Sequence, residues 1–257
     1  MEGILKKNNQ ESRETYAAEA YFSVSNLVRH CNVIHEDGRQ ETFDIAILGG
    51  KTKDGAPRFQ AIGGGAKLSD AAIEQLKAEY PNMRFRDGEE ADDARFYIPV
   101  PDAASGSGEE AINERDKFVH DVMDRFNSPE APLFKCSDEM SRELVEELTE
   151  VKDGLPAPLS EEEAGEIKIE YTGAVSPIQW GTSASGRAGS SAYYYRTFHL
   201  YDITVSEKIF EKLRASDRMR VLSEEDVAAL RASTQKGEAA AKLGDGSVLA
   251  ENVFPAN

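Results

Sequence analysis

The chain has 257 residues, and its 30 Lys and Arg against 47 Asp and Glu give a net charge of −17 at pH 7. Such an acidic surface repels phosphate backbones, so general nucleic-acid binding is not expected. The sequence has neither an apolar run long enough for a membrane-spanning helix nor the apolar stretch of a signal peptide. Its two cysteines are too few for a disulfide framework and are typical of a reducing compartment. We therefore expect a cytoplasmic protein that does not associate with membranes.

The N-terminal part is polar and then changes to β-like alternation. Residues 1–25 are expected to be a lead-in, with weak helical character over 11–22. Alternating apolar residues then predict three strands, joined by turns that contain Asp37-Gly38 and Asp54-Gly55, in an antiparallel meander. The third strand runs into a turn, Gly63-Gly64-Gly65. The three predicted strands span residues 27–34, 42–48 and 58–62.

The rest of the chain mixes helical and strand patterns. Apolar residues at helical spacing, with proline or glycine at several ends, predict helices near residues 70–80, 109–127, 137–152, 206–214 and 223–233. Alternation predicts strands near residues 83–86, 95–100, 166–171 and 193–203. This order predicts an α+β fold, an α/β/α sandwich on a mixed sheet.

The chemistry-bearing pattern lies on the predicted helix 137–152. Glu143, Glu146 and Glu147 stand at i, i+3 and i+4, so their carboxylates share one helix face. Three carboxylates on one face repel each other unless a cation neutralises them, and oxygen ligands of this kind suit Mg²⁺ or Mn²⁺. Arg142 can pair with one carboxylate and orient it. The alternative is an ordinary solvent-exposed face, which is common in a chain this acidic.

The segment Arg142-Glu143-Leu144-Val145-Glu146-Glu147 matches the latter part of the Nudix box, REUXEE, where U is apolar. A Nudix fold also has a glycine-rich turn after an upstream strand and an aromatic-rich strand with a closing helix downstream. The sequence resembles the divergent SMODS-associated NUDIX type of bacterial anti-phage signalling systems over about residues 26–232. The other segments that carry this resemblance are 59–64, 95–100, 196–203 and 221–226.

The resemblance implies a Nudix-like domain over residues 26–234, followed by a tail at 235–257. It implies Mg²⁺-dependent hydrolysis of a nucleoside diphosphate-linked substrate in prokaryotic antiviral defence. Glu143, Glu146 and Glu147 would hold the metal, helped by a carbonyl of Gly63 or Gly64. Glu143 or a loop carboxylate would be the base, and a homodimer is compatible with the family.

The sequence departs from the ordinary box in three places. Gly63-Gly64 lies far upstream of Arg142, so residues 66–136 would be an α/β insertion between the glycine turn and the catalytic helix. Thr149 replaces the box glycine, and Phe134 stands where the upstream glutamate is expected. These departures favour an alternative function, in which a catalytically inactive Nudix fold binds a nucleotide as a sensor.

Three arginines are candidates for contacting substrate phosphates. Arg84 and Arg95 lie on the predicted strands of the insertion. A guanidinium group can bind phosphate with two parallel hydrogen bonds. The alternative is that they pair with the acidic residues between those strands. Arg187 is the only charged residue of a Gly/Ser/Ala-rich loop, which is either a lid or an ordinary surface loop. A third reading of the whole chain is an interaction protein whose acidic face binds a basic partner.

Overall fold

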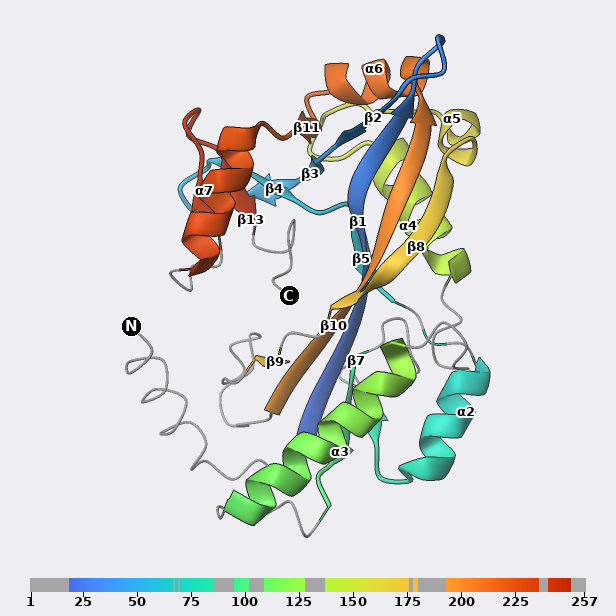
Figure 1. Cartoon of the computed structure of the whole chain (residues 1–257), viewed down its shortest axis with the longest axis vertical. Helices are drawn as coiled ribbons and strands as arrows, with labels where there is room; N and C mark the ends of the chain where they lie inside the picture. The colour runs from blue at the N-terminus through green and yellow to red at the C-terminus, as the bar shows by residue number, and fades with distance from the viewer. Residues whose placement is uncertain are drawn as a thin grey trace. The chain divides into compact units, whose positions relative to one another are not determined.

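The computed structural model describes residues 19–66, 68, 70–85, 95–101, 109–127, 137–175, 178–179, 193–235 and 240–250. Within these residues the fold is α+β, with two mixed sheets and six helices (Figure 1). None of the described helices is both long and apolar enough to cross a membrane. The helices are α2 (Asp70–Glu79), α3 (Glu109–Asn127), α4 (Ser137–Thr149), α5 (Glu161–Gly165), α6 (Glu207–Ala215) and α7 (Glu224–Gln235).

The larger sheet has eight strands and is built on two long neighbours, β1 and β10. Its main path runs β6 (Arg84–Phe85), β7 (Arg95–Pro99), β1 (Glu19–Ile34), β10 (Tyr193–Ser206) and β8 (Lys168–Val175). Off this path, β1 also pairs with β2 (Gln40–Phe43) and β5 (Gly63–Gly65), and β10 pairs with β9 (Ile178–Gln179).

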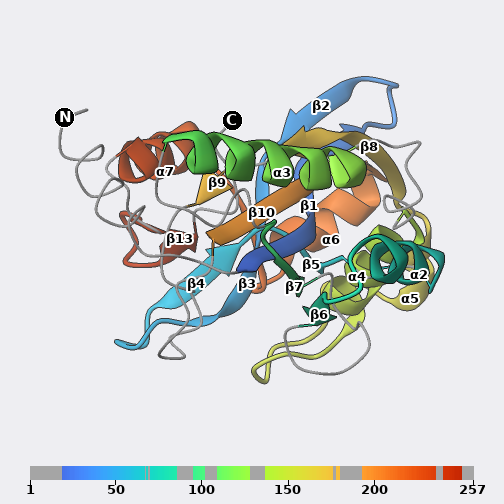
Figure 2. The ribbon, with the colours of Figure 1, turned by 90° about the horizontal axis from the view of Figure 1, so that it is seen from below.

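The smaller sheet has five strands, and its centre is the antiparallel β3–β4 hairpin, which Figure 2 shows as adjacent strands. Here β13 pairs in parallel with β4, which makes the sheet mixed. Its order is β11 (Met219–Val221), β3 (Ile45–Lys51), β4 (Pro57–Gln60), β13 (Val248–Ala250) and β12 (Ala240–Lys242).

Contacts divide the chain into two compact units. Unit 1 contains residues 1–25, 65–137 and 176–198, and unit 2 contains 26–64, 138–175 and 199–257. The core of unit 1 joins the first half of β1 to β7, α2 and α3. Phe22 of β1 stacks on Phe96 of β7, with ring centroids 5.5 Å apart.

Unit 2 has two hydrophobic clusters. The larger one packs the second half of β1 with β3, β10, α4 and α6, and it includes the stacked rings of Phe43 and Phe210. The smaller one packs α7 on the five-stranded sheet around Leu230, which is fully buried. Both clusters bury apolar faces that neither a helix nor a sheet can bury alone.

The predicted three-stranded meander is wrong. Strand β2 pairs with β1 in the larger sheet, whereas β3 pairs with β4 and β11 in the smaller one, so the chain changes sheets at Asp44. The run Gly63-Gly64-Gly65 is also more than a turn, because it forms strand β5 against β1. Alternation shows which residues are extended, but it does not show which sheet they join.

Both ends of the described chain also differ from expectation. Residues 19–22 were expected to be helical, yet they begin β1, because Ala20 and Phe22 alternate into the unit 1 core. Within the expected tail 235–257, the structure forms β12 and β13. The helices predicted near 70–80, 109–127, 206–214 and 223–233 are confirmed as α2, α3, α6 and α7.

Candidate functional site

Helix α4 turns one face into the core of unit 2 and presents its carboxylates on the other side. Its apolar residues recur at i, i+4 and i+8, which places them on one side of a helix. They are Met140, Leu144 and Leu148, each at most 1% exposed. The same packing leaves Glu143, Glu146 and Glu147 outside the buried stripe, with Glu146 the most exposed of the three.

The protein's own cations pair with the three carboxylates. Arg142 donates from Nη2 to Glu143 and from Nη1 to Glu146, both at 2.5 Å, which confirms that it pairs with a carboxylate. Lys152 Nζ lies 3.5 Å from Glu147 Oε2. Arginine and lysine therefore already reduce the repulsion between the carboxylates, so this face is stable without a bound cation.

A buried arginine fixes the C-terminal end of α4. Arg218 is 1% exposed and donates to the backbone carbonyls of Glu147, at 2.8 Å, and Glu150. These carbonyls lack partners inside the helix, and a cation there also offsets the negative end of the helix dipole. Arg218 Nη2 lies 3.8 Å from Glu147 Oε2 as well. It thus holds the end of the helix on which Glu147 stands.

Strand β5 meets α4 at Gly64. A Cβ atom on Gly64 would lie 2.2 Å from Glu143 Oε2, so the glutamate carboxylate fills the space where a side chain would stand. The preceding residue, Gly63, has φ +133°, and a Cβ there would lie 2.0 Å from the carbonyl oxygen of Asn26. The glycines therefore let the strand approach β1 and the carboxylate approach the strand. Gly63-Gly64 and the glutamate face, far apart in sequence, come together here.

Glu143 is the carboxylate with a perturbed acidity. Its side chain is 14% exposed, and this burial raises its pKa above the ordinary glutamate value. Arg142 counteracts the increase, and the charges of Glu146 and Glu147 add to it. A carboxylate whose pKa is raised binds a proton more strongly than an exposed glutamate does.

The α4 face offers the type of oxygen ligand that Mg²⁺ binds. Carboxylate and backbone carbonyl oxygens are the ligands that hard divalent cations prefer. Because Gly64 has no side chain, the Glu143 carboxylate can lie close to the backbone of β5. Within the described part of the chain, however, no three His, Cys, Asp or Glu side chains are already gathered for a metal. Arg142 holds two of these carboxylates instead. Its pair with the exposed Glu146 is of a kind worth about 0–1 kcal/mol, so a rearrangement costs little.

Two of the predicted phosphate-binding arginines belong to unit 1, whereas the α4 face belongs to unit 2. Arg84, in unit 1, donates to both carboxylate oxygens of Glu19, at 3.0 and 2.6 Å, and covers the ring of Tyr97 at 3.8 Å. The acidic residues between β6 and β7 lie outside the described residues, so the expected pairing with them stays a prediction. Arg95 is also in unit 1, on β7. Arg187 lies outside the described residues.

Sequence reasoning missed Asn26, a polar residue inside a buried stretch of β1. Asn26 is fully buried, and neither Nδ2 nor Oδ1 of its amide has a hydrogen-bond partner. An available signal was its position directly before the predicted strand that starts at residue 27. The roles of Lys152 and Arg218 were also missed, since their distance along the chain from Glu147 gives no pattern.

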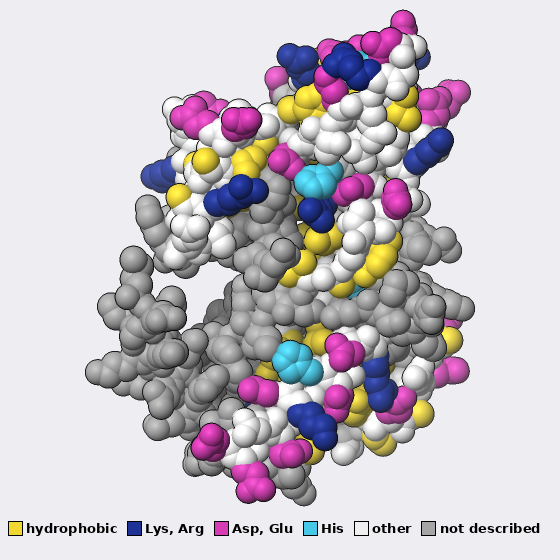
Figure 3. Space-filling model, viewed as in Figure 1, with side chains coloured by type: hydrophobic (Ala, Val, Ile, Leu, Met, Phe, Trp, Pro, Cys, Tyr) yellow, Lys and Arg dark blue, Asp and Glu magenta, His cyan; other side chains and the backbone are white. Residues whose placement is uncertain are grey.

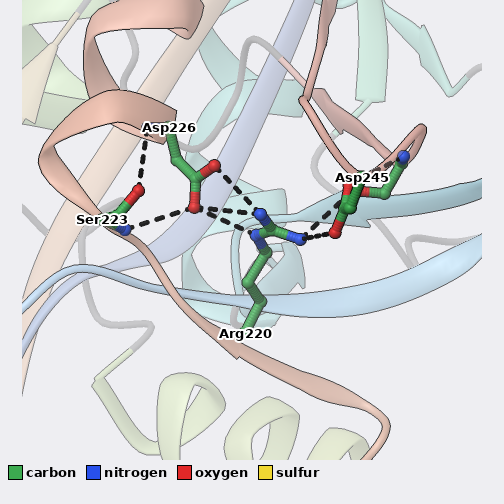
Figure 4. A network of polar contacts seen from close by, with 5 residues as sticks. Arg220, Ser223, Asp226 and Asp245 are labelled. Carbon is green, nitrogen blue, oxygen red and sulfur yellow. Dashed lines mark hydrogen bonds and ion pairs between the residues drawn. The ribbon is translucent and has the colours of Figure 1, made fainter.

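Unit 2 also contains a closed charged network outside this site. Arg220 of β11 donates to Asp226, at 2.9 Å, and to Asp245, at 2.6 Å (Figure 4). Asp226 in turn accepts from the backbone of Ser223 at 3.2 Å, at the start of α7. This network ties α7 and the turn before β13 to the smaller sheet, and we assign it a structural role.

The described charged side chains on one face of the molecule are mixed in sign (Figure 3). On the face drawn in Figure 3, Asp and Glu side chains are interspersed with Lys and Arg over the described residues. None of the protein families, curated proteins or solved structures compared with the chain matches it. Function must therefore be argued from the α4 face itself.

Proposed function

We propose that the protein is a Mg²⁺-dependent hydrolase of a nucleoside diphosphate-linked substrate, with its active site on the α4 face. The observation that carries the proposal is the close approach of Gly64 to Glu143 Oε2. It brings a glycine strand, a partly buried glutamate and two further carboxylates to one place, as the resemblance to the Nudix box implies. The prokaryotic defence context, the cytoplasmic location and a homodimer rest on the resemblance and the composition alone.

Each residue of the face has a role in this proposal. Glu146 and Glu147 bind the cation, and Glu143, whose pKa is raised by burial, accepts the proton of the attacking water. With a cation on the carboxylates, Arg142, which otherwise donates to Glu146, would be free to pair with a phosphate oxygen. Arg218 keeps the end of α4, and with it Glu147, in place.

Bound Mg²⁺ supplies charge neutralisation on the pyrophosphate and lowers the pKa of water bound to it. The chain itself contributes orientation and the proton acceptor. Because positioning and a general base are each worth about 100-fold or more in rate, loss of one carboxylate should abolish measurable turnover.

The test is a hydrolysis screen with Mg²⁺ and Mn²⁺ over nucleoside triphosphates, dinucleotide cofactors, nucleotide sugars and cyclic oligonucleotides. Wild type is compared with Glu147→Gln. The matched control is Glu150→Gln, which removes the same charge from an exposed position just beyond the end of α4. We expect metal-dependent turnover by wild type and Glu150→Gln and a loss of at least about 100-fold in Glu147→Gln. Equal turnover by all three proteins would contradict the assignment.

A second candidate function is nucleotide binding without turnover. The pairing of all three glutamates with arginine or lysine favours it, because this arrangement is stable without a metal. A sensor of this kind would be stabilised by one nucleotide, since a ligand that binds only the folded state raises the melting temperature. Thermal stabilisation without product would support the sensor, and metal-dependent product would exclude it.

A further inference from the structure

The buried amide of Asn26 stands out because it makes no hydrogen bond within the protein. Asn26 is 0% exposed, and both Nδ2 and Oδ1 lack a partner. Most buried side-chain polar atoms in folded proteins are paired, and an unpaired amide costs stability. A group that destabilises the fold is a candidate for a role in binding or catalysis.

The strand register places this amide beside the candidate site. Val28 N donates to Ile62 O at 2.9 Å, and Ala66 N donates to Val24 O at 3.0 Å. These two bonds put Asn26 directly opposite Gly64 in the antiparallel β1–β5 pair. Residues opposite each other in such a pair direct their side chains to the same face of the sheet.

On that face the space at Gly64 is filled by Glu143. A Cβ at Gly64 would lie 2.2 Å from Glu143 Oε2. In an antiparallel pair the opposing Cβ positions are about 4.5–5.5 Å apart. The Asn26 amide and the Glu143 carboxylate therefore lie on the same face of the sheet, on either side of the position of Gly64. Arg142 engages the other oxygen of Glu143, Oε1.

We infer that Asn26 is a positioning residue, whose amide holds a water molecule against Glu143; this inference rests on the proposed hydrolase function. The neutral amide can donate and accept, so it binds water without adding charge beside the carboxylate. In the reaction the water gives its proton to Glu143 and its oxygen bonds to phosphorus. The bond from phosphorus to the leaving phosphate oxygen breaks, and its electron pair stays on that oxygen.

The test variant is Asn26→Leu, which replaces the amide with an apolar side chain of similar size. The matched control is Asn32→Leu on the same strand, because the Asn32 amide oxygen accepts a hydrogen bond from Thr42 at 2.7 Å. We expect Asn26→Leu to raise the melting temperature by a few degrees, since an unpaired buried amide is removed. We expect Asn32→Leu to lower it and to leave turnover unchanged.

Kinetics separate positioning from a structural role. For Asn26→Leu we expect kcat to fall about 100-fold with KM nearly unchanged, and Asn26→Ser, which keeps a polar group, to recover part of the loss. A lower melting temperature in Asn26→Leu, or unchanged kcat, would overturn the inference. If wild type has no turnover on any substrate, the proposed function fails. The melting temperature of Asn26→Leu then still shows whether the Asn26 amide stabilises or destabilises the fold.

Discussion

The Arg220 network and the α4 face are both charged clusters of unit 2, but their hydrogen bonding differs. Arg220 contacts two aspartates. Burial opposes the shift at Asp226, but hydrogen bonds from Arg220 and Ser223 lower its pKa below the ordinary value, and hydrogen bonds from Ser247 and then Arg220 lower the pKa of Asp245. On the α4 face, burial raises the pKa of Glu143, and the amide of Asn26 is unpaired. The first cluster stabilises its charges in the folded state, whereas the second keeps a carboxylate in a less favourable place.

This difference separates a structural cluster from a candidate site. A network built for stability satisfies its polar groups and lowers the pKa of its carboxylates. Groups with unfavourable burial cost stability, and they are concentrated where a ligand or a reaction needs them. The four predictions that follow test this contrast, from the largest expected effect to the smallest.

Gly63→Ala should destabilise the fold strongly. A methyl group there would lie 2.0 Å from the backbone carbonyl oxygen of Asn26, and φ +133° is unfavourable for alanine. Backbone cannot move aside as a side chain can, so we expect a loss of roughly 2–4 kcal/mol in the free energy of unfolding. Chemical denaturation measures it. A loss below about 0.5 kcal/mol would show that β5 is not held as described.

Gly64→Ala should affect the site rather than the fold. Its methyl group meets only the end of the Glu143 side chain, at 2.2 Å from Oε2, and that side chain can rotate away. We expect a loss of stability below about 1 kcal/mol and a loss of turnover near 100-fold. The neighbouring Gly63→Ala is the contrast. Full activity in Gly64→Ala would contradict the placement of Glu143 in the site.

Asp226→Asn should destabilise unit 2 in a pH-dependent way. It weakens the charged hydrogen bonds to Arg220, so we expect a loss of about 1–2 kcal/mol at pH 7. The folded-state pKa of Asp226 is lowered, so its contribution is complete above the unfolded value, about 3.9, and is lost as the pH falls through the folded value.

Thermal unfolding at pH 7, 4 and 3 checks this prediction. The difference between wild type and Asp226→Asn should be constant down to about pH 4 and shrink below it. Glu225→Gln, which changes the neighbouring exposed residue of α7, should show little effect at any of these values. A difference that grows as the pH falls would contradict the sign of the pKa shift.

Arg142→Gln should have the smallest effect on stability and a positive effect on metal binding. The variant loses an ion pair to the exposed Glu146, which contributes about 0–1 kcal/mol. It frees Glu143 and Glu146 from a competing cation, so we expect Mn²⁺ to bind a few-fold more tightly, measured by calorimetry. Weaker binding would show that Arg142 orients the ligands instead of competing with the metal.

Local elements could be predicted because their patterns depend on neighbouring residues. The stripe Met140, Leu144, Leu148 and Val151 predicted α4 and the side on which its carboxylates lie. The structure shows both, but α4 ends at Thr149 and Val151 is 73% exposed. The i, i+3 and i+4 spacing of the glutamates is likewise a property of the helix alone. Arg142 stands four residues before Glu146, so its pairing with a carboxylate could be expected for the same reason.

Long-range features were not predictable in this way. The change of sheet at Asp44 depends on whether β3 continues beside β1 after β2 or pairs with β4 and β11, and the alternation of residues 42–48 runs through both strands. Arg218 reaches the end of α4 from a position 71 residues after Glu147. The unpaired state of Asn26 follows from what surrounds its side chain in three dimensions. These properties arise from tertiary packing, which overrides local propensity.

The most direct test of the α4 face as a ligand site is Mn²⁺ binding, followed by the loss of the free-ion signal in electron paramagnetic resonance. Wild type, Glu147→Gln and the control Glu150→Gln are titrated side by side. We predict that wild type and Glu150→Gln bind Mn²⁺ and that Glu147→Gln binds it at least about 10-fold more weakly. Equal binding by all three proteins, or no binding by wild type, would contradict the assignment of this face as a metal site.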